Sequence, residues 1–392
     1  MKAVILAAGE GTRLAPLTNV RPKPMLPVGN RPVLEYVVEA AAEAGIDEVI
    51  LVVGYKRERI QNHFGDGDAW GIDVTYAVQD TQLGTGNAIV TAESYIGGDF
   101  VVLNGDRIVD ASFVERVIAE RERTGDVVMG VTRVDEPELY GVVEVENGRV
   151  VDVTEKPPVH AVASEFVNGG VYAFGPDVFA AIRRTEPDGE LAITKTLDEM
   201  LESHVIRAVQ NPGPWLDVTR PWDLLTVNGQ VIDRDGGRRA GSARVDDAAS
   251  VAEPTVLGEG TSVQPGAVVL RGTALGENVT VGPNAVVENS ILLPDAVVGP
   301  GVVLRDCVVG ANAVVGANAV VGPNATVEGG AADVVLGDVV HRDVRLGGVI
   351  GDNADLGGGV SAAPGTILGN GAEVGRGAAI DGRIAPGTVV RR

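Results

Sequence analysis

The chain has 392 residues, of which 45% are hydrophobic and 22% are charged, and its formal net charge is −22. These proportions are those of a folded globular protein, so wholesale disorder is excluded, and the length predicts two or three domains. The acidity argues against duplex nucleic acid as a partner, because phosphate backbones attract Lys and Arg.

Apolar runs and helical patterns alternate along the first part of the chain. Residues 2–8 form an apolar run that ends at Gly9, which is typical of a strand buried on both faces of a parallel sheet. A helix is predicted from Pro32, a favourable first-turn residue, to Gly45, a natural helix stop. Further strands are predicted at residues 48–53, 73–78 and 100–103, and further helices at residues 86–95 and 112–124. This alternation predicts a Rossmann-like, doubly wound α/β domain over residues 1–228.

The second part of the chain is a repeat. Residues 229–250 are polar and rich in glycine and charge, and they are expected to be a linker. In residues 251–392, aliphatic side chains recur about every six positions, with a five-residue step after Leu293: Leu257, Val263, Val269, Leu275, Val281, Val287, Leu293, Val298, Leu304, Val309, Val315, Val321, and then Ile350, Leu356, Ala362, Leu368, Val374 and Ile380. This period predicts a hexapeptide parallel β-helix, in which residues 328–345 break the period and bulge out as a loop. Such coils leave room only for slim side chains, which explains the 53 glycines and the aromatic content of only 4%.

Charge and cysteine usage indicate the cellular setting. Only five of the 32 basic residues are Lys, and this acidic, Arg-rich composition resembles that of proteins from salt-loving microbes, although an acidic enzyme from a high-GC genome would look the same. The single cysteine, Cys307, excludes an internal disulfide framework and fits a reducing cytosol. The first apolar run is too short for a signal peptide, and no run of 18 apolar residues follows. We therefore expect a soluble, cytoplasmic protein with no membrane partner.

A glycine-rich turn follows the first predicted strand. The sequence LAAGEGTRL at residues 6–14 could present backbone N–H groups to phosphate oxygens. A lone Gly-x-Gly more often marks an ordinary tight turn, and neither the dinucleotide fingerprint nor the P-loop is complete here. However, Arg13 lies close by, and Lys23 follows with its backbone restricted by Pro22 and Pro24. Together these residues predict a clamp for a triphosphate.

The sequence LAAGEGTRLAPLTNVRPKPMLPVGNRPVLEY, residues 6–36, resembles the opening signature of the sugar-1-phosphate nucleotidyltransferases. In that family, a sugar phosphate attacks the α-phosphorus of a nucleoside triphosphate, and pyrophosphate leaves. The resemblance extends through most of the predicted α/β domain. It implies a reaction that depends on positioning and charge stabilisation rather than on a covalent nucleophile.

The resemblance implies a role for each matching residue. Catalysis is expected to depend on Arg13, Lys23 and Asp106. The nucleotide is expected to contact Leu6, Ala8, Gly9, Gly11, Thr12, Gln79, Gly84 and Thr85, with the Gln79 amide pairing with the edge of uracil or thymine. The sugar phosphate is expected to contact Gly141, Glu155, Lys156 and Asn168. The expected Mg²⁺ ligands are Asp106 and Asp217, and two carboxylates suffice because Mg²⁺ keeps waters and substrate phosphates as its other ligands. Considered alone, Gln79 would be a surface residue at a strand end and Asp106 a turn former.

The order of the two domains is similar to that of the archaeal-type bifunctional N-acetylglucosamine-1-phosphate uridyltransferase/glucosamine-1-phosphate acetyltransferases and related glucose-1-phosphate thymidylyltransferases. In that family, a left-handed parallel β-helix trimerises, binds acetyl-CoA and carries a catalytic His in a His-x-x-Tyr context. The corresponding residues 292–299 contain neither His nor Tyr, which puts acetyl transfer in doubt. His341, in the expected loop, is interpreted as a polar loop residue.

The sequence therefore predicts Mg²⁺-dependent transfer of a nucleotidyl group from UTP or dTTP to a hexose-1-phosphate, either N-acetylglucosamine-1-phosphate or glucose-1-phosphate. One alternative is a bifunctional enzyme that also acetylates glucosamine-1-phosphate with acetyl-CoA. Another is a non-catalytic regulatory subunit, which is disfavoured because Gly11, Arg13, Lys23, Asp106 and Lys156 are all present. The β-helix predicts a homotrimer or a dimer of trimers, because closed symmetric packing covers its flat faces.

Overall fold

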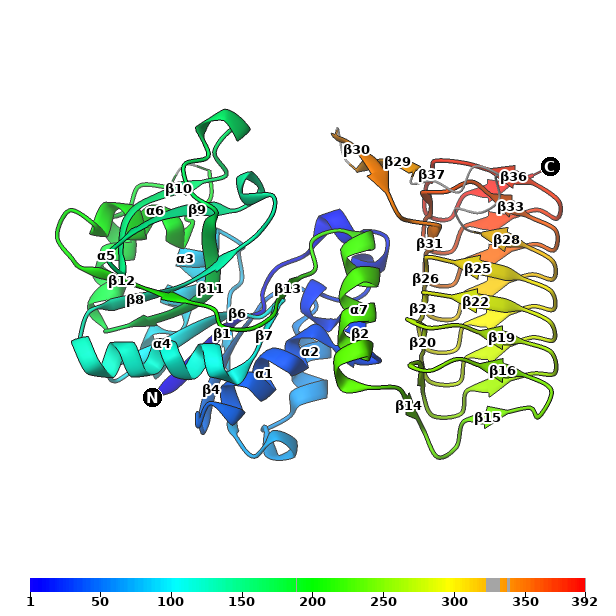
Figure 1. The fold of residues 1–392 in the computed structure, drawn as a ribbon, viewed down its shortest axis with the longest axis horizontal. Helices are drawn as coiled ribbons and strands as arrows, with labels where there is room; N and C mark the ends of the chain where they lie inside the picture. The colour runs from blue at the N-terminus through cyan, green and yellow to red at the C-terminus, as the bar shows by residue number, and fades with distance from the viewer. Residues whose placement is uncertain (188, 322–331, 337–338, 392) are drawn as a thin grey trace. The chain divides into compact units, whose positions relative to one another are not determined.

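The computed structural model describes residues 1–187, 189–321, 332–336 and 339–391 (Figure 1). Its internal contacts divide the chain into two compact units. Unit 1 comprises Met1–Glu10, Pro22–Met25 and Val33–Asp217, and unit 2 comprises Gly11–Arg21, Leu26–Pro32 and Val218–Arg392. The chain thus passes from one unit to the other several times near its N-terminus.

The sheet of unit 1 begins with four parallel strands in the spatial order β5 (Asp73–Val78), β4 (Glu48–Val53), β1 (Lys2–Leu6) and β6 (Phe100–Asn104). All four were expected from their apolar runs, and β4 and β5 have the predicted bounds. Their carboxyl ends lie at one edge of the sheet, because Leu6 is in register with both Val52 and Asn104. The alternation of strands and helices is confirmed for this half of the unit.

The other half of the same sheet is largely antiparallel, and the sequence analysis did not predict it. It continues from β6 through β11 (Phe166–Phe174), β8 (Val127–Arg133), β12 (Ile206–Gln210), β10 (Arg149–Glu155) and β9 (Gly141–Glu146). Asn147 and Gly148 join β9 to β10, both with positive φ, which is the usual chemistry of a tight hairpin. A separate antiparallel pair joins β7 (Arg107–Val109) to β13 (Trp215–Asp217).

Helices cover both faces of the sheet, so the α/β domain is doubly wound. Successive residues of β1 face opposite ways: Val4 packs in one core cluster, and Ala3 and Ile5 pack in another. The predicted helices are present as α1 (Val33–Glu43), α3 (Thr85–Thr91), which is followed by a short 3-10 turn, and α4 (Ala111–Thr124). The additional helices are α2 (Arg57–Phe64), α5 (Asp177–Arg184) and α6 (Ile193–Met200). The short 3-10 helices of the chain are η1 (Thr12–Leu14), η2 (Leu17–Asn19), η3 (Lys23–Met25), η4 (Asp68–Trp70), η5 (Glu93–Tyr95), η6 (Pro137–Leu139) and η7 (Val159–Ala161).

Unit 2 contains helix α7 (Pro221–Asp235), the strand pair β2 (Pro27–Val28) and β3 (Arg31–Pro32), and a parallel β-helix with three sheets. The first sheet contains β14 (Arg238–Arg239), β17 (Val256–Leu257), β20 (Ala274–Leu275), β23 (Ile291–Leu292), β26 (Cys307–Val309), β31 (Gly348–Ile350), β34 (Thr366–Leu368) and β37 (Arg383–Ile384). The second contains β15 (Arg244–Val245), β18 (Ser262–Val263), β21 (Thr280–Val281), β24 (Val297–Val298), β27 (Val314–Val315), β32 (Asp355–Leu356), β35 (Glu373–Val374) and β38 (Val389–Val390). The third contains β16 (Ser250–Val251), β19 (Val268–Val269), β22 (Val286–Glu288), β25 (Val303–Arg305), β28 (Val320–Val321), β33 (Ser361–Ala362) and β36 (Ala379–Ile380).

The six-residue period marks the interior of this β-helix. The core cluster contains the expected residues at each coil, with one correction: Leu292 rather than Leu293 belongs to it. The step expected after Leu293 therefore falls between Val287 and Leu292, and a second five-residue step lies between Leu304 and Val309. Both leucines are buried, so apolarity alone could not fix the position of the step.

Two parts of unit 2 differ from a simple linker and loop. Residues 229–250 contain the end of α7 and the strands β14 to β16, because the corners of a coil use the same polar, Gly-rich composition as a linker. The functional division at residues 228 and 251 stays a prediction. In the expected loop 328–345, the described residues form an antiparallel hairpin of β29 (Ala332–Leu336) and β30 (Val339–Val344), while residues 328–331, 337 and 338 lie outside the described residues.

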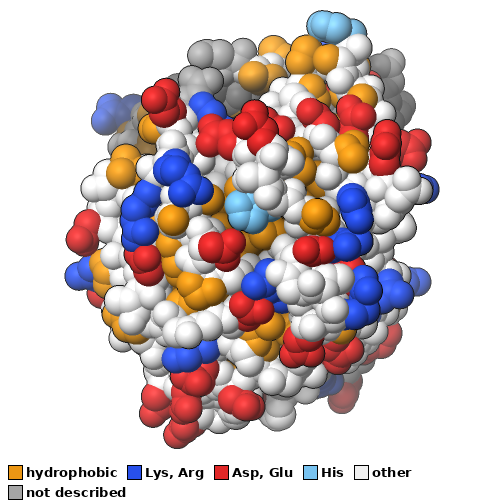
Figure 2. Space-filling view, turned by 90° about the vertical axis from the view of Figure 1, so that its left-hand side faces the viewer, with side chains coloured by type: hydrophobic (Ala, Val, Ile, Leu, Met, Phe, Trp, Pro, Cys, Tyr) orange, Lys and Arg blue, Asp and Glu red, His pale blue; other side chains and the backbone are white. Residues whose placement is uncertain are grey.

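Surface charge and helix length are relevant to nucleic-acid and membrane partners, respectively. On the face shown in Figure 2, Lys and Arg side chains are interspersed with Asp and Glu rather than gathered in a basic track. Within the described part of the chain, no helix is both long and apolar enough to cross a bilayer.

Candidate active site

A cavity of about 310 Å³ lies at the carboxyl edge of the parallel strands of unit 1. Strands β1, β5 and β6 end beside it, as expected for a ligand site in an open α/β sheet. Eight of the residues that the sequence analysis singled out line this cavity: Leu6, Ala8, Gly9, Lys23, Gln79, Gly84, Thr85 and Asp106. The sequence analysis did not identify the other lining residues: Pro24, Gln82, Ala88, Asn104 and Glu190.

Close backbone approaches shape two turns of the cavity. The Gly105 N–H donates to Leu6 O at 2.9 Å, and a Cβ at Gly105 would lie 2.7 Å from the same oxygen. Gly84 has a φ of +105°, and a Cβ there would lie 2.6 Å from Leu191 O. A side chain at either position would displace backbone. These glycines therefore set the positions of Asp106 and Thr85, which follow them.

The Gln79 side chain is buried and held in place by a neighbour from α3. Its Nε2 donates to Asn87 Oδ1 at 2.8 Å, and Gln82 Nε2 donates to Ala8 O at 2.7 Å. Thr85 Oγ1 accepts from Ile193 N at 2.9 Å. A primary amide carries two donor hydrogens and an acceptor oxygen, so it can pair with the imide edge of a pyrimidine base. Sequence reasoning missed Asn87, which orients this amide.

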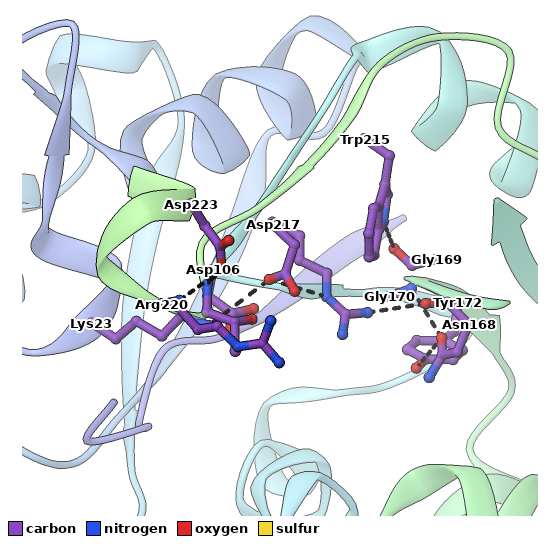
Figure 3. A network of polar contacts seen from close by, with 12 residues as sticks. Lys23, Asp106, Asn168, Gly169, Gly170, Tyr172, Trp215, Asp217, Arg220 and Asp223 are labelled. Carbon is purple, nitrogen blue, oxygen red and sulfur yellow. Dashed lines mark hydrogen bonds and ion pairs between the residues drawn. The ribbon is translucent and has the colours of Figure 1, made fainter. Parts of the chain in front are cut away.

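Lys23 joins the two carboxylates that were expected to bind metal. Its Nζ lies 2.6 Å from Asp106 Oδ2 and 3.9 Å from Asp217 Oδ1. The three side chains are labelled in Figure 3. The side chains are 15% exposed for Lys23, 31% for Asp106 and 6% for Asp217. Burial alone would raise the pKa of Asp106, but the charges of Lys23 and Arg107 and the hydrogen bond from Lys23 hold it below its usual value. Asp106 is therefore anionic at neutral pH.

The donor set fits Mg²⁺. Carboxylate oxygens are the ligands that Mg²⁺ prefers, and it needs only one or two from the protein when phosphates are bound. Asn104, two residues before Asp106, has a buried Oδ1 with no hydrogen-bond partner among the described residues, which adds a neutral oxygen to the cavity lining. Within the same described residues, no cluster of three or more His, Cys, Asp or Glu could hold an ion. Asp106 and Asp217 thus fit an ion that takes its other ligands from water and substrate phosphates.

Arg107 is a site residue that sequence reasoning missed. Its Nη1 donates to Asn168 O at 3.0 Å, and its Nε lies 3.8 Å from Asp217 Oδ1. The guanidinium also lies over the Trp215 ring, 4.9 Å from the ring centroid. It therefore connects the carboxylate pair to strand β11, where Asn168 lies. The only sequence signal was its position directly after Asp106.

The structure brings three of the four expected sugar-phosphate residues into one cluster. A Cβ at Gly141 would lie 3.0 Å from Glu155 Oε2 and 3.7 Å from Asn168 Cβ. Thr194 Oγ1 donates to Glu155 Oε2 at 3.0 Å, and Tyr172 OH donates to Asn168 Oδ1 at 2.7 Å. Burial raises the pKa of Tyr172 to about 12, so this phenol stays a neutral donor. Thr194 and Tyr172 were not identified from the sequence.

Lys156, the fourth sugar-phosphate residue, lies at the end of β10. Its Nζ is 3.4 Å from Glu155 Oε1, and its side chain is largely exposed. Its N–H donates to Tyr140 O at 3.0 Å, and its φ is +43°, a left-handed conformation that directs the side chain at this turn. Lys156 thus places a largely exposed cation beside Glu155.

Two expected nucleotide-binding residues, Gly11 and Thr12, and one expected catalytic residue, Arg13, belong to unit 2. Gly11 has a φ of +70° and its carbonyl accepts from Leu14 N and from Thr18 Oγ1, both at 2.9 Å. Thr12 and Arg13 start the 3-10 helix η1, and both side chains are exposed. Gly11, Thr12 and Arg13 are not among the residues that line the cavity described for unit 1.

In unit 2, the ring of His341 lies 5.1 Å from the ring of Trp222, tilted by 57°. This contact makes His341 part of the packing between the hairpin and α7. The interpretation of His341 as a polar loop residue needs this correction: it lies on strand β30 and is partly buried.

Comparison with known proteins gives consistent matches. Residues 2–234 match the family model described as nucleotidyl transferase, and residues 251–345 match the GMPPB C-terminal domain. The bifunctional protein GlmU of Methanococcus maripaludis is 33% identical over 267 residues, 67% of this chain and 62% of that protein. The low-salt glycan biosynthesis nucleotidyltransferase Agl11 of Haloferax volcanii is 38% identical over 64% of this chain and 73% of that protein. The glucose-1-phosphate thymidylyltransferase of Streptomyces antibioticus is 36% identical over 67% of this chain and 74% of that protein.

Solved structures agree with this assignment. A crystal structure from Bacillus anthracis, assigned to glucose-1-phosphate thymidylyltransferase, has a TM-score of 0.56 and 29% identity, covering 59% of this chain and 96% of that one. A UDP-glucose pyrophosphorylase in complex with UDP-glucose has a TM-score of 0.55 and 26% identity, covering 59% of this chain and 98% of that one. The chain matches about 62% of the length of the bifunctional relative. On the family match over more than half of its length, the chain belongs to the nucleotidyl transferase family.

Proposed function

We propose that this protein transfers a nucleotidyl group from UTP or dTTP to a hexose-1-phosphate, in a Mg²⁺-dependent reaction that releases pyrophosphate. The proposal rests mainly on the contacts of the Arg107 side chain. This side chain connects the Lys23, Asp106 and Asp217 cluster with the Asn168 backbone of the sugar cluster. Both substrates could thus meet where cations are concentrated.

In the proposed reaction, an oxygen of the sugar phosphate attacks the α-phosphorus of the triphosphate. The bond from that phosphorus to the bridging oxygen of the β-phosphate breaks, and pyrophosphate leaves with the electron pair. Bound Mg²⁺ would neutralise charge on the reacting phosphates, held by Asp106 and Asp217. Lys23 would stabilise negative charge as it develops, and its fixed place 2.6 Å from Asp106 limits the reorganisation needed.

Two groups of residues are proposed to determine specificity, one for the base and one for the sugar. Gln79, held by Asn87, would pair with uracil or thymine and would leave purines unpaired. Glu155, held by Thr194, would accept hydrogen bonds from sugar hydroxyls, and Gly141 leaves room beside it for the ring. A site built to make hydrogen bonds rejects ligands that leave its polar groups unpaired.

The β-helix is proposed to be mainly an oligomerisation module that forms a homotrimer or a dimer of trimers. Residues 292–299 offer no histidine as a base, and His341 packs against Trp222. Light scattering in molar KCl should give the mass of three or six chains, and a monomer would refute this part. Acetyl-CoA should not be consumed with glucosamine-1-phosphate; turnover that is lost in His341→Ala would overturn that expectation.

The proposed transfer is tested by pyrophosphate release and product mass over a matrix of substrates. UTP, dTTP, CTP, ATP and GTP would each be combined with glucose-1-phosphate and N-acetylglucosamine-1-phosphate, with Mg²⁺, at low salt and in molar KCl. We expect release with UTP or dTTP only. A clear preference for a purine triphosphate would refute the role of Gln79, and no release with any pair would refute the function.

A further inference from the structure

We propose that the β-helix positions Lys23 for nucleotidyl transfer, through a buried ion pair between Arg21 and Asp352. Arg21 Nη2 lies 2.8 Å from Asp352 Oδ2, although 331 positions separate the two residues in the sequence. Both residues belong to unit 2. This inference rests on the proposed function for the reaction that Lys23 serves, but the anchoring itself can be measured separately.

The Asp352 carboxylate is fixed by neighbouring coils. Its Oδ1 accepts from Ala311 N at 2.7 Å, and its own N–H donates to Asn370 Oδ1 at 3.0 Å. Asp352 is 2% exposed, and Arg21 is 8% exposed. A buried carboxylate with a guanidinium partner in this geometry holds its position far better than a pair on the surface. The β-helix thus provides a rigid anchor for Arg21.

Asp352 lies at a corner of the β-helix but is buried, unlike the acidic residue at a corner of the same sequence pattern. Gly351-Asp352-Asn353 has the same pattern as Gly276-Glu277-Asn278, which turns an earlier coil. Glu277 is exposed there, whereas Asp352 is covered. An acidic residue is therefore compatible with the corner without a partner, and the burial of Asp352 coincides with the contact to Arg21.

Arg21 is itself fixed at the end of a short, packed segment. Its Nη1 donates to Leu17 O at 3.1 Å, and Leu17 is fully buried. Only Pro22 separates Arg21 from Lys23, and at about 3.6 Å per residue of extended chain the two Cα atoms are at most about 7 Å apart. Proline fixes φ, and Met25 N donates to Pro22 O at 2.9 Å, which closes the turn that carries Lys23. Because the chain between them is short and constrained, a displacement of Arg21 is expected to displace Lys23 as well.

The chain beyond Lys23 is held in the same unit as Arg21. Gly29 N donates to Asn228 Oδ1 at 2.8 Å, and Asn228 Nδ2 donates to Gly272 O at 2.8 Å on a coil corner. Asn30 Nδ2 donates to Leu275 O at 2.5 Å. The four residues Pro22–Met25 thus lie between two chain segments whose side chains and backbone are held within unit 2. Lys23 itself contacts Asp106, and both of these residues belong to unit 1. Arg21 and Asp352 are positioning residues in this scheme, because neither is expected to contact a substrate.

The expected effect follows from the sensitivity of catalysis to geometry. A displacement of about 1 Å of a positioning element can lower the rate about 100-fold. Asp352→Asn removes the negative charge but keeps the shape of the side chain. Because its amide retains one of the hydrogen bonds, we expect a shift of a fraction of an ångström and a kcat about tenfold lower. Asp352→Glu, which restores a carboxylate, should recover part of the loss.

The test compares Asp352→Asn with Glu277→Gln, its matched control at an exposed corner. Each full-length variant would be assayed for pyrophosphate release at least 10 °C below its unfolding midpoint, so that unfolded protein does not enter kcat. Deuterium uptake of residues 11–32 would be measured by mass spectrometry on the same samples. If Asp352→Asn does not unfold cooperatively, Arg21→Lys takes its place under the same criteria.

The proposal requires that the kcat of Asp352→Asn be at least fivefold below that of Glu277→Gln and that uptake in residues 11–32 be faster. The KM for the hexose-1-phosphate should stay within threefold, because the Glu155 and Asn168 cluster does not involve this segment. A smaller loss of kcat, or unchanged uptake, overturns the proposal. If the unaltered protein releases no pyrophosphate, the proposed function fails, and the uptake comparison alone still decides whether Asp352 anchors the segment.

Discussion

Replacing Arg107 with methionine removes a buried guanidinium and keeps most of the aliphatic volume. Asp217, which is 6% exposed, then loses the cation 3.8 Å from its Oδ1 and keeps Lys23 at 3.9 Å. Removing one partner of a buried ion pair costs about 3–5 kcal/mol, and with Lys23 still present we expect the lower end, about 3 kcal/mol. The contacts of Arg107 with Trp215 and Asn168 belong to the same side chain and are not added separately.

Calorimetry measures this loss as a shift in the unfolding temperature. For a domain of 150–250 residues, 1 kcal/mol corresponds to about 2–4 °C, so Arg107→Met should unfold about 6–12 °C earlier. The matched control is Arg207→Met, whose partner Asp126 lies 2.8 Å away in a pair with side chains 24% and 28% exposed. That variant should lose about 1 kcal/mol or less. The double variant Arg107→Met with Asp217→Asn should recover part of the loss, because it also removes the unbalanced charge.

The reasoning about Arg107 would be refuted by two results. One is a shift for Arg107→Met no larger than that for Arg207→Met. The other is a double variant that is less stable than Arg107→Met alone, since that would mean that Asp217 stabilises the fold without its cation.

Three further predictions concern the site and its pH dependence. Asp106→Asn or Asp217→Asn should lower turnover at least about 100-fold with an unchanged circular dichroism spectrum. Chelation of the metal should lower turnover to the same extent. Near-normal turnover in both variants would contradict the metal assignment. Arg13→Ala should lower kcat more than it raises the KM for the triphosphate, and steady-state kinetics that show only a KM effect would make it a binding residue. The hydrogen bond from Arg121 lowers the pKa of Asp99, so Asp99 stabilises the fold at neutral pH and this contribution fades as pH falls through that lowered pKa, below about 4. Urea titrations from pH 7 to pH 3 should therefore show the protein and Asp99→Asn converging in stability, and a constant difference would contradict the assignment.

The sequence was most informative where structure depends on local pattern. The apolar runs of β1 and β4 are buried on both faces, so composition alone marks them. The six-residue period marks the coil interior because every coil repeats the same packing. It failed at Leu292 and Leu293, since two adjacent buried leucines leave the register open.

The missed features depend on residues far apart in the chain. Strands β8, β9, β10 and β12 join the sheet through β11, which pairs with β6. Likewise, a motif could point to Glu155, but Thr194, which holds it, lies 39 positions further along the chain, in α6. Local pattern therefore identified the groups proposed to contact substrates, and tertiary contacts supplied those that orient them.

The fate of the α-phosphorus tests the central claim most directly. The protein would be incubated with Mg²⁺, a hexose-1-phosphate and UTP or dTTP, labelled in separate experiments at the α- or the γ-phosphorus. Transfer by attack on the α-phosphorus predicts that the α-label appears in a nucleotide sugar and the γ-label in pyrophosphate, in equal amounts. An α-label that appears only in free nucleotide, or that stays in the triphosphate, would contradict the account.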